Sequence, residues 1–97
     1  MHLKAKFVDV KNPKFKWETY ANNDRPALRI INEHGEVECT ATINLPDVAI
    51  PYGCALIKDY AEGEGILNEL IRLKIVGPAI GYIGTGYVTI PYCRILP

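Results

Sequence analysis

The sequence lacks an excess of charge of either sign. Its 11 lysines and arginines balance its 11 aspartates and glutamates, so the formal net charge at pH 7 is zero. Domains that bind nucleic acid by neutralising phosphates usually carry a clear basic excess. The balance therefore argues against a nucleic-acid partner, and near-zero net charge also favours self-association.

Long apolar runs are missing as well. No stretch reaches the roughly 18 uncharged apolar residues that a membrane span requires. The first six residues lead straight into Phe7 and Val8, without the apolar region and the cleavage site of a signal peptide. We therefore expect a cytoplasmic protein that has no membrane partner.

Cysteine and histidine are too few and too scattered to suggest chemistry. Cys39, Cys54 and Cys93 are odd in number and share no short spacing, which disfavours a disulfide framework and a zinc site. His2 and His34 have no serine or cysteine close by in the sequence, although catalytic groups can also meet only in space. We predict buried or half-buried thiols, no metal, no cofactor and no enzymatic activity.

What the chain does contain is enough apolar material for one core. Hydrophobic residues make up 48% of the 97 residues and charged residues 23%, which is typical of a globular domain and not of a disordered segment. A chain of this length folds as one domain. We expect a single compact α+β domain over residues 1–97.

Period-2 alternation of apolar and polar residues predicts most of the chain to be strand. The clearest case is 37–45, where Val37, Cys39 and Ala41 alternate with polar neighbours, and Gly35 suits the turn of the hairpin that precedes it. Pro91 cannot donate to a sheet ladder, so the last strand is expected at an edge or with a bulge there. The other predicted strands are 4–10, 15–20, 27–31, 54–57 and 87–95.

One segment changes period. Ile66, Leu67, Leu70 and Ile71 form a stripe at helical spacing and predict a short α-helix over about 64–75, with Gly77-Pro78 as its stop. A helix of about three turns depends on docking against other elements. The predicted architecture is therefore a twisted antiparallel sheet of five to six strands, with this helix packed on one face.

The first candidate site is the glycine-rich stretch 81–87. Gly81, Gly84 and Gly86 could bring backbone N–H groups close to a phosphate, with Tyr82, Thr85 and Tyr87 as further contacts and the tyrosines able to stack on a base. A dinucleotide fingerprint or a P-loop requires a helix after the glycines, but here a strand follows. The alternative is a glycine-rich hairpin without a ligand.

The second candidate site is the junction 58–64 between a predicted strand and the helix. Lys58, Asp59, Tyr60, Glu62 and Glu64 place an amine, a phenol and three carboxylates in one short loop. Such carboxylates can do acid–base work or hold a divalent cation, although the spacing is not that of a calcium loop. The alternative is that they complement the positive end of the helix.

The tyrosines offer a third signal, because five of the six lie in the second half of the chain. Tyrosine is common at protein interfaces, where its ring gives contact area and its hydroxyl a polar handle. The alternative is half-buried strand tyrosines, which β-propensity alone explains.

The sequence resembles a family of small single-domain proteins, a domain of unknown function carried on bacterial plasmids, conjugative elements and phages. The resemblance covers roughly residues 20–96. It is carried by Asn-Asp-Arg-Pro-Ala-Leu-Arg-Ile at 23–30, Gly-Glu at 35–36, Ala-Thr-Ile-Asn-Leu-Pro at 41–46, Ile-Lys-Asp-Tyr at 57–60, Gly-Tyr-Val-Thr-Ile-Pro at 86–91 and Cys-Arg at 93–94. The family has no agreed activity and no catalytic residues to transfer.

What the resemblance implies is a genetic context. Small neutral proteins of phages and mobile elements often inhibit host defence, either by binding a defence protein, as anti-CRISPR proteins do, or by sequestering a nucleotide signal. The first expectation is therefore a non-enzymatic inhibitor that binds a bacterial host protein in the host cytoplasm, with a homodimer also expected. The alternative is a sponge that holds a small nucleotide in the loop 81–87, with Lys58 as a further contact.

Overall fold

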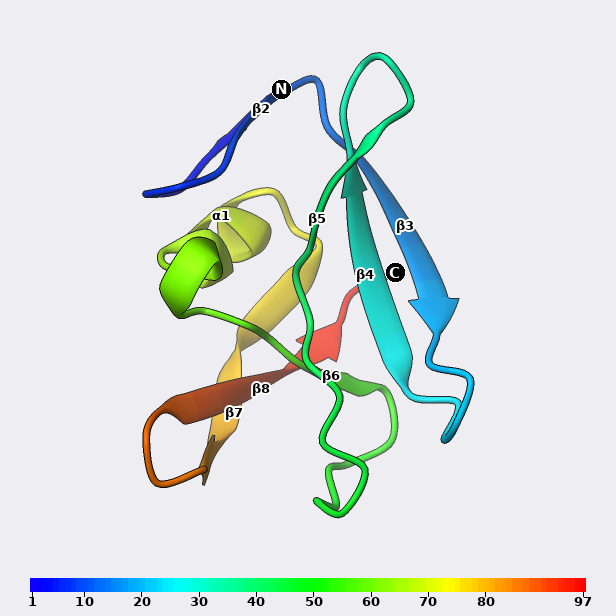
Figure 1. The fold of residues 1–97 in the computed structure, drawn as a ribbon, viewed down its shortest axis with the longest axis vertical. Helices are drawn as coiled ribbons and strands as arrows, with labels where there is room; N and C mark the ends of the chain where they lie inside the picture. The colour runs from blue at the N-terminus through cyan, green and yellow to red at the C-terminus, as the bar shows by residue number, and fades with distance from the viewer.

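The computed structural model describes residues 1–97, and the chain is mostly β with a single short α-helix (Figure 1). In chain order the elements are β1 (His2–Lys4), β2 (Asp9–Lys11), β3 (Lys14–Thr19), β4 (Pro26–Ile31), β5 (Val37–Thr40), β6 (Cys54–Leu56), the 3₁₀ helix η1 (Ala61–Gly63), α1 (Ile66–Arg72), β7 (Val76–Gly84) and β8 (Thr89–Ile95).

The strands form three small antiparallel sheets, so the prediction of one sheet of five to six strands is wrong. The sheets have the orders β1-β2, β3-β4-β5 and β6-β8-β7. The division arises within the predicted strand 37–45. Ala41 donates its N–H to Leu28 of β4, whereas Ile43 donates to Leu56 of β6 and Thr42 forms a bridge with Ile57. The segment therefore changes partner halfway and joins two sheets.

The N-terminal segment also differs from its prediction, because 4–10 is not one strand. It contributes to the hairpin β1-β2, in which Leu3 lies opposite Val10 and the Ala5 N–H donates to the Val8 carbonyl across the turn. Leu3 and Val10 are buried, whereas Phe7 is 63% exposed at the turn. Burial of that apolar pair decides the pairing, and Phe7 falls in the turn between the two strands.

The hairpin of β4 and β5 is confirmed. Gly35 takes the left-handed conformation (φ 85°). The Asn32 side chain supports the turn, since its Oδ1 accepts the N–H groups of His34 (2.9 Å) and Glu36 (3.0 Å). This local hydrogen bonding by asparagine is a standard turn device.

The strand that contains Pro91 lies at the centre of its sheet and pairs with β7 in regular register at Pro91, so neither the predicted edge nor the predicted bulge at Pro91 is present. The pairing of β6 with β8 explains why a proline is tolerated there. The Ile57 N–H donates to the Pro91 carbonyl (2.9 Å), and the Ile57 carbonyl, which would take the missing N–H, accepts from Asp59 instead (3.0 Å). Proline thus lies where β6 has just ended, and the bulges lie on β7, around Ala79.

The helix is shorter than 64–75, and its stop is not Gly77-Pro78, which lies within β7. Lys74 adopts a left-handed conformation (φ 62°), and its N–H donates to Ile71 while the Ile75 N–H donates to Leu70. These two bonds are those of a Schellman motif with lysine where glycine is usual. The turn ends the helix and sends the chain directly into β7.

The core lies where the three sheets and the helix meet. In Figure 1, α1 lies beneath the N-terminal hairpin and beside the start of β7, and the contacts of α1 with β1 and β7 agree. The buried apolar side chains of the core come from every sheet and from the helix: Leu3, Val8, Val10, Leu28, Ile30, Ala41, Ala55, Ile57, Ile66, Leu70, Val76 and Cys93. A helix with only two turns depends on this packing.

Candidate functional site

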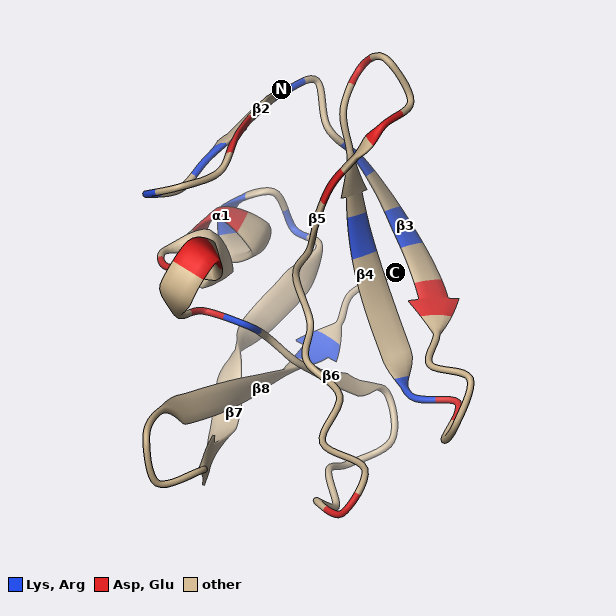
Figure 2. Ribbon diagram, viewed as in Figure 1, with Lys and Arg blue, Asp and Glu red and all other residues tan.

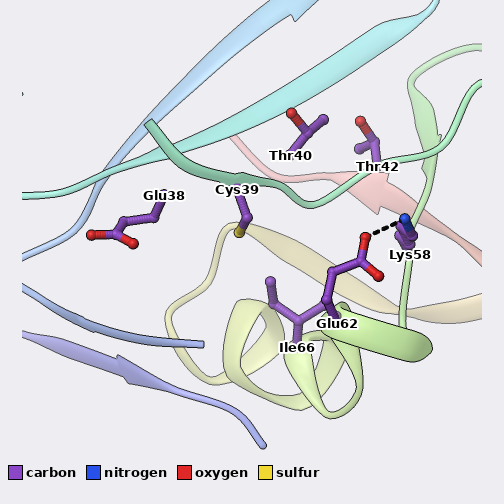
Figure 3. Close-up of a pocket in the computed structure, with 8 residues that line it drawn as sticks. Glu38, Cys39, Thr40, Thr42, Lys58, Glu62 and Ile66 are labelled. Carbon is purple, nitrogen blue, oxygen red and sulfur yellow. Dashed lines mark hydrogen bonds and ion pairs between the residues drawn. The ribbon is translucent and has the colours of Figure 1, made fainter. Parts of the chain in front are cut away.

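A polar pocket of about 380 Å³ lies between β5 and the helical segment (Figure 3). One wall comes from β5 and the residues that follow it, and the other comes from the junction 58–64 and the start of α1. Its lining residues are Glu38, Cys39, Thr40, Thr42, Lys58, Glu62, Gly63 and Ile66.

Two predicted site residues meet at this pocket. The Lys58 ammonium contacts the Glu62 carboxylate at 2.5 Å, four residues along the chain. The hydrogen bond from Lys58 lowers the pKa of Glu62, and the same bond raises the pKa of Lys58. Both groups are therefore held in their charged forms, so neither is suited to exchange a proton near neutral pH.

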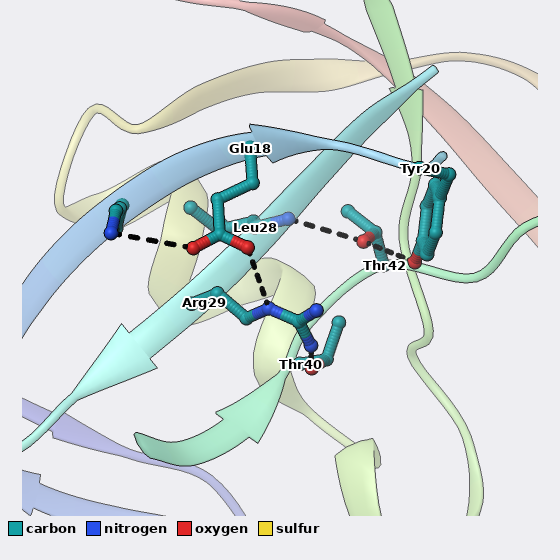
Figure 4. A network of polar contacts seen from close by, with 7 residues as sticks. Glu18, Tyr20, Leu28, Arg29, Thr40 and Thr42 are labelled. Carbon is teal, nitrogen blue, oxygen red and sulfur yellow. Dashed lines mark hydrogen bonds and ion pairs between the residues drawn. The ribbon is translucent and has the colours of Figure 1, made fainter. Parts of the chain in front are cut away.

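Thr40 and Thr42, which line the pocket, belong to a polar network with residues of β3 and β4 and with Tyr20 after β3 (Figure 4). Thr42 Oγ1 accepts the Leu28 N–H at 3.2 Å and bonds the Tyr20 hydroxyl at 2.9 Å. Thr40 Oγ1 accepts from Arg29, whose Nε also donates to Glu18 (3.3 Å). The hydroxyls of Thr40 and Thr42 are therefore already used to join β4 to β5 and to the residues that follow β5.

Cys39 supplies a thiol to the pocket but not a reactive one. Burial raises its pKa above the ordinary value, and the charges of Glu38 and Glu62 add to the effect. Only the thiolate is a good nucleophile, so this cysteine stays protonated and inert at neutral pH. All three cysteines are free, and Cys54 and Cys93 are buried.

The other residues of the junction have structural roles. Asp59 Oδ1 accepts the Leu67 N–H (3.0 Å) and so satisfies one of the free donors at the start of α1, because the capping residue Gly65 has no side chain. The Tyr60 ring lies beside the Lys58 ammonium, with 5.7 Å between the ring centroid and Nζ. Glu64 pairs with Lys6 at 3.3 Å and does not line the pocket.

The second set of predicted site residues does not join the pocket. Tyr82 lies in β7, while Thr85 and Tyr87 lie in the turn before β8. Gly81 is part of β7 and not of the loop, and a Cβ there would lie 2.1 Å from the ring of Tyr92 on the opposite strand. None of the four surface hollows is lined by a residue of 81–87.

This hairpin has a feature that the sequence patterns did not predict. From Ile75 to Cys93 the chain contains no aspartate, glutamate, lysine, arginine or histidine. Figure 2 shows the corresponding ribbon of β7 and β8 without charge up to Arg94. Ile80 and Tyr82 are 54% and 63% exposed and Tyr87 is 98% exposed. The signal was present as an uncharged run with tyrosines, but its exposure required the structure.

Comparisons with known proteins add no relative: no family model, no curated protein and no solved structure matches the chain. The resemblance to proteins of mobile elements stays a prediction. Within the structure, no cluster of three or more His, Cys, Asp or Glu side chains is placed to hold a metal ion. None of the helices has the length and apolar character of a transmembrane span.

The two candidate regions therefore differ in what they offer a partner. Every buried side-chain nitrogen and oxygen has a hydrogen-bond partner within the protein, and polar side chains of the pocket walls are already bonded within the fold. A ligand there would have to break existing bonds before forming its own. The hairpin of β7 and β8 instead leaves large uncharged side chains exposed.

Proposed function

We propose that this protein acts by binding another protein through the hairpin of β7 and β8. The observation that carries the proposal is the combination of a charge-free run, 75–93, with three exposed large side chains, those of Ile80, Tyr82 and Tyr87. Ile80 and Tyr82 lie on one strand and Tyr87 in the turn that follows it, and exposed apolar side chains gathered on one hairpin favour association. The centres of protein interfaces are depleted of charge and enriched in tyrosine.

Two of the other exposed apolar residues, Phe7 and Val37, lie beside charged residues. Phe7 follows Lys6, whose ammonium lies 5.4 Å from the centroid of its ring. Val37 lies between Glu36 and Glu38, both exposed. Isolated apolar residues among charges are normal on protein surfaces and mark no site.

We propose a bacterial protein as the partner, and inhibition of a host defence system as the outcome of binding. The support is the sequence resemblance to small proteins of phages and mobile elements. Proteins of that genetic context often inhibit host defence, either by binding a defence protein or by sequestering a nucleotide signal. An uncharged, tyrosine-bearing hairpin suits the binding of a defence protein because it needs no chemistry to act and buries aromatic contact area.

The alternative of a nucleotide sponge is less well supported by the geometry. A phosphate site in residues 81–87 would need convergent donors around a hollow, but the space beside Gly84 and Gly86 is open, with nothing within 4 Å of the position that a Cβ would take. The pocket that does exist is lined by Glu38 and by the Lys58–Glu62 ion pair, so its charged groups carry a net negative charge that would repel a phosphate.

The test is capture of a partner with three tagged forms of the chain from bacterial lysate. The unchanged chain should retain a stoichiometric protein. Tyr87→Ser should retain it about fivefold more weakly or worse, because truncating an exposed aromatic contact of an interface costs about 1 kcal/mol or more. Tyr52→Ser is the matched control, since Tyr52 is equally exposed but lies far along the chain from the hairpin.

Equal retention by Tyr87→Ser and Tyr52→Ser would show that the hairpin is not the binding surface. The same samples separate the two candidate functions. Denaturing the purified chain and analysing the released small molecules should yield no nucleotide. A nucleotide in stoichiometric amount, with no protein captured, would favour the sponge.

A further inference from the structure

The outer edge of β7 has no partner in the fold. The sheet order β6-β8-β7 leaves β7 at one side of its sheet. The Thr85 N–H donates to the Val88 carbonyl, and bonded and non-bonded pairs alternate along an antiparallel ladder. Gly84 and Tyr82, opposite Thr89 and Pro91, are therefore non-bonded with β8. Their N–H and C=O groups face the open edge.

The usual protection of such an edge covers only its first half. Natural edge strands are guarded by charged side chains, prolines or bulges. In β7 the proline is Pro78 and the register shifts lie between Val76 and Gly81, so both devices protect the beginning of the strand. The part from Gly81 to Gly84 has a regular register and no charged residue.

This open part is complementary to itself. If two copies of the strand run antiparallel with Ile83 facing Ile83 of the other copy, each Tyr82 lies opposite Gly84 of the other copy. Tyr82 and Gly84 are the two residues whose backbone groups face outward, so both resulting pairs exchange their N–H···O bonds. The same register therefore satisfies the outward backbone groups on both strands.

The protein already contains one pair of this kind. Within the sheet, Gly81 lies directly opposite Tyr92, and the Tyr92 ring covers the space where a Cβ of Gly81 would lie. An aromatic ring across from a glycine compensates for the missing side chain in a sheet. Gly84 has nothing within 4 Å of its corresponding position, so it has room for the ring of Tyr82 from a second copy.

We propose that two copies of this chain associate through the β7 edge, antiparallel and centred on Ile83, to form one continuous sheet of order β6-β8-β7-β7-β8-β6. The zero net charge of the chain leaves no overall repulsion between copies. A partner strand with charged side chains would meet no residue of opposite charge in 75–93. A second copy supplies an uncharged strand of matching pattern.

Dimerisation goes beyond the proposed function and does not depend on it. It covers Tyr82, one of the three exposed side chains of the proposed binding surface, whereas Tyr87 in the turn lies outside the paired segment and stays free for another protein. The contact is one short strand pair and therefore smaller than the roughly 800 Å² per partner of a standard interface. We expect a weak dimer whose population depends on protein concentration.

The first test is sedimentation velocity over roughly a hundredfold range of protein concentration, because a weak dimer shifts from mostly monomer to mostly dimer across such a range. The unchanged chain should move from the mass of one chain toward that of two. Tyr82→Lys places like charges close together on the paired strands and should stay monomeric. Tyr87→Lys, with the same change at the free turn, should dimerise like the unchanged chain.

The second test fixes the register. The two Ile83 residues would form a non-bonded pair, with Cα atoms about 4.5 Å apart, a separation that permits a disulfide. In a Cys39→Ser background, Ile83→Cys should give a covalent dimer on mild oxidation. Thr85→Cys, two residues along, should not, because the two copies of that position move apart in an antiparallel pair.

Two results would overturn edge pairing. The first is a chain that stays monomeric at every concentration, together with Ile83→Cys that does not cross-link faster than Thr85→Cys. The second is equal loss of dimer in Tyr82→Lys and Tyr87→Lys, which would show association through the exposed side chains of the turn instead. Neither result would affect capture of a partner protein through Tyr87.

Discussion

The two ends of this molecule use their residues in opposite ways (Figure 2). The N-terminal hairpin and α1 are joined through charged groups. Glu69 accepts the Lys4 N–H (2.8 Å) and the guanidinium of Arg72 (2.9 Å), and Arg72 donates further to the His2 carbonyl. The hairpin of β7 and β8 has no charge from Val76 to Cys93 and is held by backbone bonds and packing.

The difference shows which region uses its polar groups within the fold and which leaves groups free for a partner. Around α1, the strands β1 and β2 are too short to form a long ladder, so side chains of α1 hydrogen-bond to the backbone of β1 and join the elements. The β7-β8 hairpin needs no such joints, because its long ladder satisfies its inner backbone groups. Its outer edge and its exposed tyrosines therefore stay available. Four substitutions test this contrast.

The largest effect is expected for Gly63→Ala in the charged region. A Cβ at Gly63 would lie 2.1 Å from the backbone carbonyl oxygen of Lys58, which cannot rotate away. We expect a loss of about 3 kcal/mol in the free energy of unfolding, as for other overpacked sites. Gly84→Ala in the hairpin is the control, because nothing lies within 4 Å there. Urea denaturation of dilute samples measures both, and equal losses would contradict the contrast.

Glu69→Gln should have the next largest effect. Hydrogen bonds from Arg72, and then from the Lys4 N–H, lower the pKa of Glu69 from 4.5 to about 2. A carboxyl with a lowered pKa stabilises the fold fully above its unfolded pKa and loses that stabilisation as pH falls through its folded pKa. The substitution should therefore cost about 1 to 2 kcal/mol at pH 7 and much less near pH 2.

Measuring the free energy of unfolding from pH 7 down to pH 2 checks this prediction. Glu62→Gln is the matched control, because its ion pair with Lys58 is mostly exposed on the glutamate side and exposed pairs contribute little. A constant difference between Glu69→Gln and the unchanged chain over the whole pH range would show that the Glu69 carboxylate is not the source of the stability.

Lys74→Gly should raise stability. Lys74 holds a left-handed conformation in the turn between α1 and β7, where glycine adopts the same angles without strain. The gain should be about 0.5 to 1 kcal/mol, after the larger backbone freedom of glycine in the unfolded chain is subtracted. Thermal melting measures it, with Lys74→Ala as the comparison that removes the side chain but not the strain. A gain of the same size in Lys74→Ala would contradict the explanation.

The smallest effect is expected for Tyr87→Ser. The ring is 98% exposed, so its removal should change the free energy of unfolding by less than about 0.5 kcal/mol. Partner capture should nevertheless fall, which separates binding from folding. A large loss of stability in this variant would mean that Tyr87 packs within the fold and does not serve an interface.

Local patterns in the sequence predicted the elements that depend mainly on their own residues. The strand over 27–31 and its hairpin follow from β-branched residues, Asn32 and Gly35, and the helix follows from the stripe that includes Ile66 and Leu70. The predictions failed where pairing with another segment decided the structure. The segment 37–45 divides between two sheets because Thr42 pairs with Ile57, and 4–10 folds back because Leu3 pairs with Val10.

The candidate sites divide in the same way. Composition was enough to show that 58–64 gathers charged groups and that 81–87 gathers glycine and tyrosine. The folded arrangement was needed to show that Lys58 and Glu62 neutralise each other, that Asp59 serves the helix, and that Gly81 makes room for Tyr92. Whether a polar or aromatic side chain is free for a partner depends on what packs against it, and that is set by contacts between residues far apart in the chain.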